Sequence, residues 1–330
     1  MSLPQTMRAL EQTSLQGPQD MRLVTDVPVP RPGPGQVLIR VAAAGVNFAD
    51  IARARGTFGH GPTPPYLAGF EAAGEVVAVG EGVTSPERGA LVTGVTTGAF
   101  AAYALLPAAA AMPVPPGWTP QQALGLVVNW PTALAALKTV GRLSAGETVL
   151  VHAAAGATGQ AAVVAAKRYG AKVIARASRS KHDIARAAGA DHVLDARSDE
   201  LAAEVRALTG GLGADLVLEA NGGATFAASL AAARRVTGRV VVYGLAGGEA
   251  TVSNWQLIYA HSVQIIGLNI GALMQAEPRL FGELMRELFG LVAAGVIAPC
   301  RPATYPLAEG ARALAELEAR ATVGKLALLP

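Results

Sequence analysis

Short apolar runs alternate with segments of helical period through the second half of the chain. Such runs are typical of strands that are buried on both faces of a parallel sheet. Six strands are predicted, at residues 149–151, 173–175, 192–195, 215–220, 239–244 and 263–267. Segments of helical period lie between them, among them 181–188, 200–208 and 225–235. This alternation predicts an α/β domain with a doubly wound parallel sheet.

The first part of the chain has a different pattern, in which short β-like runs are separated by Gly and Pro. Strands are predicted at 22–24, 36–41, 74–80, 91–93 and 100–104. This punctuation predicts a small barrel-like β domain. A polar, Gly-rich excursion at 44–61 interrupts it, and such excursions often carry function.

Helical period returns at 123–128 and 132–137, before the first strand of the parallel sheet. The tail from about residue 269 predicts two helices, at 279–294 and 309–320, and ends in an apolar segment. We expect this tail to return to the β domain.

The first strand of the parallel sheet is followed by a turn of small residues, 154–159, and then by a helix. The turn matches G-x-G-x-x-G with Ala154 in the first Gly position. Small residues there let the backbone approach a pyrophosphate, and the N–H groups at the helix start bind it. A tight turn without a ligand is the alternative, but the strand–turn–helix–strand context favours a dinucleotide.

The end of the second strand carries cations where NAD-binding proteins usually carry an acidic residue. The segment 176–181 reads RASRSK, and the first carboxylate after it is Asp183. Arg binds phosphate in a bidentate way, so the three cations and two hydroxyls of this segment, Arg176, Ser178, Arg179, Ser180 and Lys181, favour the 2′-phosphate of NADP over NAD. A solvated basic turn is the alternative. The strand ends at 221–223 and 244–246 are expected to line the same crevice.

Composition narrows the class of protein. The 330 residues are 51% hydrophobic and 15% charged, with a formal net charge of +3 that is scattered along the chain. Scattered charge gives no argument for nucleic acid. A single cysteine excludes a disulfide framework and a Cys-rich zinc site. No signal-peptide core or membrane-spanning run is present in the sequence, and we expect a cytoplasmic protein.

Four segments resemble the medium-chain dehydrogenase/reductase superfamily, and specifically its zinc-free NADPH:quinone oxidoreductase branch, which includes zeta-crystallin. They are GVNFAD at 45–50, GFEAAG at 69–74, AAAGATG at 153–159 and ATVGK at 321–325. The resemblance implies a GroES-like β-barrel catalytic domain at 1–124, completed by 269–330. It also implies a Rossmann NADP-binding domain at 125–268.

Zinc-dependent relatives carry Cys at or near Asn47 and Gly-His-Glu where this chain has Gly69-Phe70-Glu71. The resemblance therefore implies that no metal polarises the hydride acceptor, which disfavours alcohol oxidation. It implies a reductase that uses NADPH to reduce a quinone or an α,β-unsaturated carbonyl compound. An enoyl thioester reductase is one alternative. A non-catalytic NADPH-binding protein with a crystallin-like or RNA-binding use is another.

The resemblance also assigns roles to residues. Asn47 and Asp50 are implied near the nicotinamide as catalytic residues, with a loop-organising hydrogen bond as the alternative for Asp50. The implied cofactor-binding residues are Asn47, Thr132, Ala155, Gly156, Ala157, Thr158, Ser178, Arg179, Lys181, Asn221, Tyr243, Gly244, Leu245 and Arg320. A helix cap remains the alternative for Thr132, and a solvated helix-end cation the alternative for Arg320.

The substrate pocket is where the chain departs from the family. Some relatives carry two Tyr where this chain has Ala52 and Phe58, and Trp130 precedes the Thr132 position. Phe58, His60, Tyr66 and Trp130 are therefore the predicted pocket residues. The family also implies a homodimer that pairs sheet edges near residues 263–268.

Overall fold

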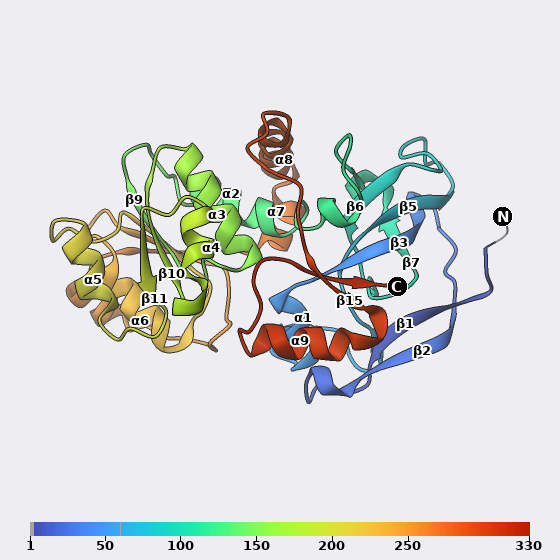
Figure 1. Ribbon diagram of the computed structural model, residues 1–330, viewed down its shortest axis with the longest axis horizontal. Helices are drawn as coiled ribbons and strands as arrows, with labels where there is room; N and C mark the ends of the chain where they lie inside the picture. The colour runs from blue at the N-terminus through green and yellow to red at the C-terminus, as the bar shows by residue number, and fades with distance from the viewer. Residues whose placement is uncertain (1–2, 60) are drawn as a thin grey trace. The chain divides into compact units, whose positions relative to one another are not determined.

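The computed structural model describes residues 3–59 and 61–330. The chain forms two compact units. The first unit is Met1–Val128 together with Ala298–Pro330, and the second is the continuous segment Asn129–Ile297. The early and late parts of the chain therefore belong to the same unit, while the middle forms a unit of its own (Figure 1).

The first unit is built on two sheets. The three-stranded sheet has the order β2-β1-β4, from Met21–Pro28, Thr6–Gln12 and Tyr66–Leu67. The larger sheet has the order β15-β16-β3-β5-β6-β8, and β7 (Tyr103–Pro107) also pairs with β3. Its other strands are Ala303–Pro306, Leu326–Leu329, Gln36–Val46, Glu71–Val79, Leu91–Val95 and Met112–Pro113.

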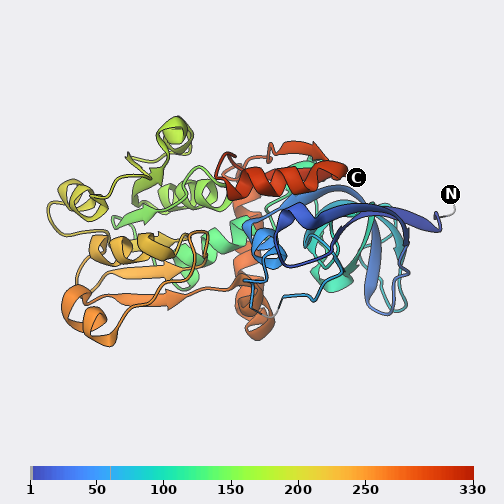
Figure 2. The same ribbon diagram turned by 90° about the horizontal axis from the view of Figure 1, so that it is seen from below.

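The tail completes the core of this unit. Helix α9 (Gly310–Glu318) buries Ala313 and Leu314 against Leu10 of β1, Phe100 and Leu328 of β16 in one apolar cluster. Helices α1 (Phe48–Ala54) and α9 lie side by side, although most of the chain separates them (Figures 1 and 2). The return of the tail thus closes the β domain.

The second unit contains one six-stranded parallel sheet in the order β11-β10-β9-β12-β13-β14. In chain order this is 3-2-1-4-5-6, the order of the doubly wound nucleotide-binding fold, with its switch point between β9 and β12. The strands are Thr148–Val151, Lys172–Ala177, His192–Asp195, Leu216–Glu219, Arg239–Val242 and Gln264–Gly267 for β9 to β14. The predicted fold class is confirmed, and all six predicted strands are present.

The helices of this unit connect and cover the strands. They are α2 (Asn129–Leu134), α3 (Ala157–Arg168), α4 (His182–Ala187), α5 (Leu201–Leu208), α6 (Gly223–Ala232), α7 (Ile270–Ala276) and α8 (Pro278–Ala293). Short 3-10 turns lie at Pro18–Asp20, Ala108–Ala110, Gln121–Ala123, Arg179–Lys181 and Leu307–Glu309. Single π-helical segments occur at Ala135–Thr139 and Gln256–His261.

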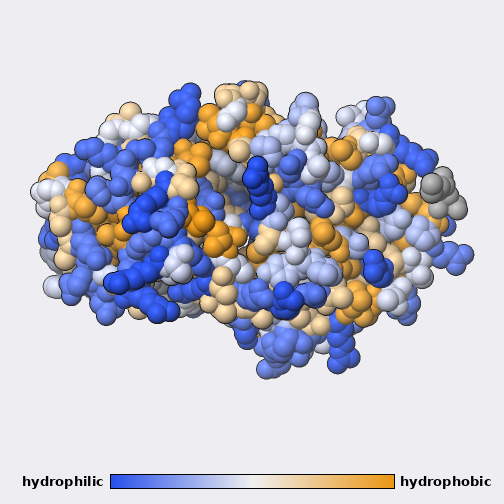
Figure 3. Space-filling model, viewed as in Figure 1, coloured by the Kyte–Doolittle hydropathy of each residue, from blue (hydrophilic) through white to orange (hydrophobic). Residues whose placement is uncertain are grey.

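The boundary in the tail differs from the predicted one. Residues 269–297, which the sequence placed with the β domain, belong to the second unit. The cause is helix α8, which packs against α2 and has Leu284, Met285 and Leu288 buried. Other hydrophobic residues of α8 remain at the surface, at the top of Figure 3.

The segment 123–128 is not the helix that its period predicts. The N–H of Gly125 donates to Glu71 Oε1 at 2.5 Å instead of to a helical carbonyl, and the φ of Gly125 is +90°. A helix needs negative φ at every residue, so the α-helix begins only at Asn129. Within the described part of the chain, no helix has the length and apolarity needed to cross a membrane.

Candidate functional site

The turn after β9 forms a cradle at the start of helix α3. Gly156 is the N-cap of this helix, and no side chain caps it, so the first N–H groups stay available for an anion. A Cβ at Gly159 would lie 2.2 Å from the carbonyl oxygen of Ala153, so only glycine fits there. This is the role of the third glycine in the dinucleotide fingerprint, which lets the helix approach the strand. Predicted residues Ala155, Gly156, Ala157 and Thr158 therefore lie together in the cradle.

Helix α2 holds one side of this turn. It packs against α3, and the Asn129 Nδ2 atom donates to Thr158 Oγ1 at 3.0 Å. Thr132 lies buried in the same helix, one turn further on. Thr132 is inside α2, whose first residue is Asn129, which removes the helix-cap alternative for Thr132. Asn129 was not assigned from the sequence.

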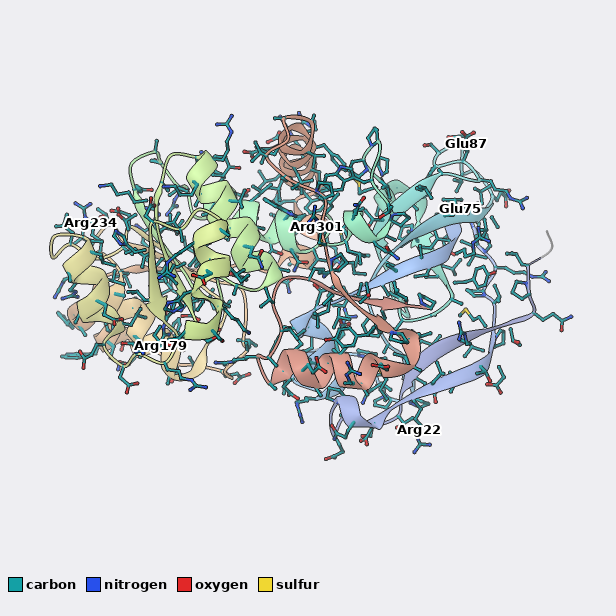
Figure 4. All side chains as sticks on the ribbon, viewed as in Figure 1. Arg22, Glu75, Glu87, Arg179, Arg234 and Arg301 are labelled. Carbon is teal, nitrogen blue, oxygen red and sulfur yellow. The ribbon has the colours of Figure 1, made fainter. Side chains whose placement is uncertain are left out.

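The loop after β10 carries the predicted phosphate-binding cations at the surface. Ser178 precedes the 3-10 turn that contains Arg179 and Lys181. Arg179 is labelled in Figure 4. Its side chain is 85% exposed and pairs with Asp195, with 2.7 Å between Nε and Oδ2. Partial burial lowers the pKa of the Lys181 ammonium. An exposed ion pair is weak, so Arg179 can exchange Asp195 for a phosphate.

Arg176, the remaining cation of that segment, has a different function. Its guanidinium is buried and donates to the carbonyl oxygens of Ala196 and Ser198, at 2.8 and 3.0 Å. It therefore supports the loop after β11.

Glu219, the last residue of β12, organises the switch point. Its side chain is fully buried, and Oε1 accepts from the backbone N–H groups of Asn221 and Gly222, at 2.6 and 3.0 Å. Oε2 accepts a short hydrogen bond from the hydroxyl of Ser229 on α6. The carboxylate thereby fixes the turn that carries Asn221.

His152, which follows β9, extends this network. Its Nε2 lies 2.9 Å from Ser229 Oγ and 3.7 Å from Glu219 Oε2. The single hydroxyl proton of Ser229 is directed to Glu219 or to the carbonyl oxygen of Thr225, at 2.9 Å, and with either acceptor Nε2 of His152 is the donor to Ser229. Burial, together with the charge of Arg176, lowers the pKa of the imidazole to about 4, against the opposing effect of Glu219. His152 is therefore neutral near pH 7.

The loops after β12 and β13 are joined through their backbones. The N–H of Gly247 donates to Asn221 O at 2.5 Å, and a Cβ at Gly244 would lie 2.4 Å from Ala220 O. Tyr243 is partly buried, and burial with the charge of Glu219 raises the pKa of its phenol. Leu245 is 50% exposed. Predicted residues Asn221, Tyr243, Gly244 and Leu245 thus share the carboxyl edge of the sheet with the cradle.

In the first unit, Asn47 and Asp50 open helix α1. Asn47 is the N-cap, and its N–H donates to Asp50 Oδ2 at 2.9 Å, as in a capping box. The other carboxyl oxygen, Oδ1, is buried and has no hydrogen-bond partner among the described residues. Burial raises the pKa of the Asp50 carboxyl to about 7, against the opposing effects of the Asn47 N–H and of Arg53.

The amide of Asn47 is held by a buried ion pair. Lys325 Nζ lies 2.6 Å from Glu71 Oε2 and 2.7 Å from Asn47 Oδ1, and Asn47 Nδ2 donates to the same Glu71 oxygen at 2.8 Å. All three side chains are buried. A Cβ at Gly45 would lie 2.5 Å from Glu71 Oε2, so this position must be glycine. We call Asn47, Glu71 and Lys325 the lysine-centred network, and His152, Ser229 and Glu219 the histidine-centred network.

The remaining predicted pocket residues are divided between the units. Phe58 and Tyr66 lie in the first unit beside Arg53, while Trp130 lies in helix α2 of the second. His60 lies outside the described residues. Arg320 belongs to the first unit, where it is exposed and has a φ of +57°.

Sequence reasoning missed several polar residues of these networks. Glu71, Lys325, His152 and Glu219 each stand beside or within an apolar run that forms a strand. A charged or titratable residue in such a run is a signal of a buried polar site, since an unpaired one is costly. The partners of each residue come from elsewhere in the chain and cannot be read from that signal.

In the first unit, the cation beside Glu71 is the ammonium group of Lys325. Phe70 has no ligand atom, and the Glu71 carboxylate already binds the Lys325 ammonium. Among the described residues, no three His, Cys, Asp or Glu side chains gather closely enough to hold a metal ion.

A Rossmann unit joined to a GroES-like β domain defines the class of this protein. The family model of the alcohol dehydrogenase GroES-like domain matches residues 33–116, and that of zinc-binding dehydrogenases matches 157–288. The chain belongs to the medium-chain dehydrogenase/reductase superfamily, in its quinone oxidoreductase-like branch.

Two curated relatives show the range of this family. The chain is 31% identical to the rat synaptic vesicle membrane protein VAT-1 homolog, over 98% of the chain and 84% of the relative. It is 34% identical to a mycocerosic acid synthase-like polyketide synthase of Mycobacterium tuberculosis, over 90% of the chain. The match covers only 14% of that synthase.

Solved structures are similar over nearly their whole length. Mycobacterial Rv1454c complexed with NADPH has a TM-score of 0.92 and 36% identity, covering 98% of this chain and 100% of that one. Escherichia coli quinone oxidoreductase complexed with NADPH has a TM-score of 0.91 and 29% identity, covering 98% and 100%. The CurK enoyl reductase has a TM-score of 0.88 and 28% identity, covering 99% of each chain.

Proposed function

We propose that this protein is an NADPH-dependent reductase that reduces a quinone or an α,β-unsaturated carbonyl compound without a metal. The observation that carries this proposal is the carboxyl edge of the parallel sheet, where an uncapped helix start and a basic loop stand together. The NADPH complexes of two similar structures support the choice of cofactor.

The residues present fit the cofactor. The cradle at Gly156–Thr158 would hold the pyrophosphate, and Ser178, Arg179 and Lys181 would hold the 2′-phosphate. The loops at Asn221 and at 243–245, with Thr132, would bind the rest of the dinucleotide. When bound, NADPH supplies the hydride, and the protein supplies orientation and electrostatics.

Arg179→Ala tests the 2′-phosphate assignment. Because NADH lacks this phosphate, the substitution should raise KM for NADPH about tenfold and leave KM for NADH within about twofold. The matched control is Arg186→Ala, an exposed arginine one helix further on that pairs with Asp183. Equal effects of Arg179→Ala on both cofactors would remove the assignment.

Asp50 is the group we propose for proton delivery in the first unit. Its free oxygen and a pKa of about 7 leave a substantial protonated fraction at neutral pH. Asn47, by contrast, has its amide held by Lys325 and Glu71. We therefore propose that Asn47 orients the loop and that proton transfer falls to Asp50 or to water.

The enoyl thioester alternative is favoured by one specific observation, the likeness to the CurK enoyl reductase over 99% of both chains. The first experiment is therefore NADPH oxidation against naphthoquinones, simple enones and crotonyl thioester at matched concentrations. Turnover confined to quinones supports the quinone reductase, and preference for the thioester supports the alternative. NADPH binding with no turnover on any acceptor would overturn the enzymatic proposal in favour of a non-catalytic protein.

The predicted homodimer and cytoplasmic location belong to this proposal. Strand β14 is the edge of the parallel sheet, and Trp255, Ile258 and Tyr259 are exposed on the segment that precedes it. We propose that a second copy pairs with this edge. Solution scattering that gives a monomeric mass would contradict the dimer, and cell fractionation tests the location.

A further inference from the structure

Arg53 occupies an unusual position on helix α1 of the first unit. Its guanidinium carbon lies 5.0 Å from the ring centre of Phe58 and 4.6 Å from that of Phe70. The faces of the guanidinium are therefore engaged by aromatic rings, as in cation–π contacts. Its hydrogen-bond donors point along the edges of the plane and are not used by this stacking.

Among the residues that the structure describes, none accepts a hydrogen bond from these donors. The guanidinium of Arg53 forms no hydrogen bond or ion pair with any residue that the structure describes, and its Nε is buried without a partner. By contrast, the neighbouring Arg55 is bound by Glu318, at 2.8 Å from Nη2 to Oε2, and by Gln16 O, at 3.0 Å. The Arg53 guanidinium is therefore a cation whose N–H groups are available to a ligand.

The nearest carboxyl group does not neutralise Arg53. Asp50, one helical turn earlier, directs Oδ2 to the Asn47 N–H, and burial raises the pKa of its carboxyl to about 7. The other carboxylate of this region, Glu71, is bound by Lys325. Arg53 thus forms no ion pair with either carboxyl group: Glu71 is bound by Lys325, and Asp50 Oδ1 has no partner among the described residues.

The walls around Arg53 are aromatic and partly accessible. Phe58 is 39% exposed, while Phe70 is buried. Tyr66 lies near both Asp50 and Arg53, whose charges act in opposite directions on the pKa of its phenol, which burial raises. A ligand that fits has an apolar body for the aromatic walls and two coplanar oxygens for the edge of the guanidinium. A carboxylate has this geometry, whereas a quinone carbonyl does not.

We infer that Arg53 is a specificity-determining residue that binds the carboxylate of the acceptor. This inference rests on the proposed reductase function and deepens it. The substrate class it assigns is the α,β-unsaturated carbonyl compounds that carry a carboxylate beyond the reacting double bond. Hydride addition at carbon and protonation remain as proposed, and Arg53 takes no part in bond making.

A matched pair of acceptors tests the inference. trans-4-Oxopent-2-enoate and its methyl ester share the same enone, and the ester carries a neutral, more electron-withdrawing CO2CH3 group in place of the carboxylate. In the wild type, KM for the acid should be at least tenfold lower than for the ester. Arg53→Gln should raise KM for the acid about tenfold or more and leave that for the ester within about twofold, because a charge-assisted hydrogen bond is lost only with the acid.

The control variant is Arg55→Gln, which removes one positive charge two residues away and should keep the preference for the acid. Arg53→Lys keeps the positive charge but loses the two parallel N–H donors of the guanidinium. Its preference for the acid over the ester should therefore lie between those of the wild type and Arg53→Gln. NADPH binding and turnover of the ester show that each variant is folded. Equal KM values for acid and ester in the wild type, or a preference unchanged in Arg53→Gln, would overturn the inference and leave the reductase function standing.

A second measurement does not require turnover. The saturated analogue 4-oxopentanoate, titrated by calorimetry, should bind the wild type at least tenfold more tightly than Arg53→Gln, and its methyl ester should bind both alike. If neither enone nor any quinone is reduced, the proposed function fails. The calorimetric result then still decides whether Arg53 binds a carboxylate.

Discussion

The two units each contain a fully buried glutamate, and they balance its charge in different ways. Glu71 meets the ammonium of Lys325 at 2.6 Å and the amide of Asn47. Glu219 meets a serine hydroxyl and two backbone N–H groups, with a neutral imidazole behind the serine. One carboxylate is paired with a cation, and the other is solvated by neutral dipoles.

The difference follows the task of each network. The lysine-centred network fixes a side chain, Asn47, beside the capping box of α1. The histidine-centred network fixes a backbone turn at the switch point of the sheet, where the cofactor of a doubly wound fold binds. A cation next to that turn would alter the charge that meets a dinucleotide, whereas neutral donors hold it without adding charge.

The largest expected effect comes from removing the cation. Lys325→Met leaves Glu71 buried and unpaired, which should lower the free energy of unfolding by about 3–5 kcal/mol in urea titrations. The double variant Lys325→Met/Glu71→Gln removes both charges and should recover part of the loss. A loss below about 1 kcal/mol in the single variant would mean that Lys325 does not compensate Glu71.

Asp50 should make the first unit less stable as pH rises. The pKa of its carboxyl is about 7 in the folded protein and 3.8 in the unfolded chain. The folded state therefore binds the extra proton between these values, and stability falls as pH rises from about 4 to 7, by roughly 4 kcal/mol. The wild-type profile minus that of Asp50→Asn should show this slope in urea titrations. If the stability profiles of the wild type and Asp50→Asn stay parallel over this pH range, the pKa of the Asp50 carboxyl is not raised.

His152 should give the second unit the opposite dependence. The pKa of its imidazole falls from 6.5 to about 4 on folding, so the unfolded chain binds the extra proton in this interval. Stability is therefore lost as pH falls from 6.5 toward 4, by roughly 3 kcal/mol. His152→Asn should remove this dependence and leave the opposing dependence from Asp50, which spans nearly the same pH range, unchanged. An imidazole NMR titration near pH 6.5 in the folded protein would contradict the shift.

The smallest effect is expected from substitution of Glu219, because its hydrogen-bond partners are neutral and no buried cation loses its counter-ion. Glu219→Leu leaves the N–H groups of Asn221 and Gly222 without their acceptor, which should cost about 2 kcal/mol and raise KM for NADPH several-fold with little change in kcat. Glu219→Gln keeps an acceptor oxygen and should retain most of the affinity. Equal losses in both variants would show that the charge, and not the acceptor geometry, holds the turn.

The same contrast shows how far the sequence could predict the molecule. The parallel sheet and its cradle follow from local patterns: apolar runs, a small-residue turn and the helix after it. Gly156 and Thr158 could be placed because the fingerprint is contiguous. The lysine-centred network could not, since Asn47 and Lys325 are 278 residues apart and only the return of the tail brings them together.

The local sequence pattern gave wrong predictions where a tertiary contact determines the backbone conformation or the unit to which a segment belongs. The period at 123–128 is helical, yet the N–H of Gly125 is taken by Glu71 and the φ of Gly125 is positive. Residues 269–297 read as the start of the tail, but packing of α8 on α2 keeps them with the second unit. The unpaired guanidinium of Arg53 could not be predicted from the sequence, because it depends on tertiary contacts such as the pairing of Glu71 with Lys325.

Strand β16 lies at the end of the chain but belongs to the first unit, so the two units can fold in a fixed order during translation. The second unit is one uninterrupted segment, so it can fold as soon as residue 297 has left the ribosomal exit tunnel. The first unit must wait for Lys325, which is synthesised after that whole segment. Until then Glu71 and Asn47 have no ammonium to bind. The nascent chain can therefore complete the unit with the parallel sheet first and the β unit last.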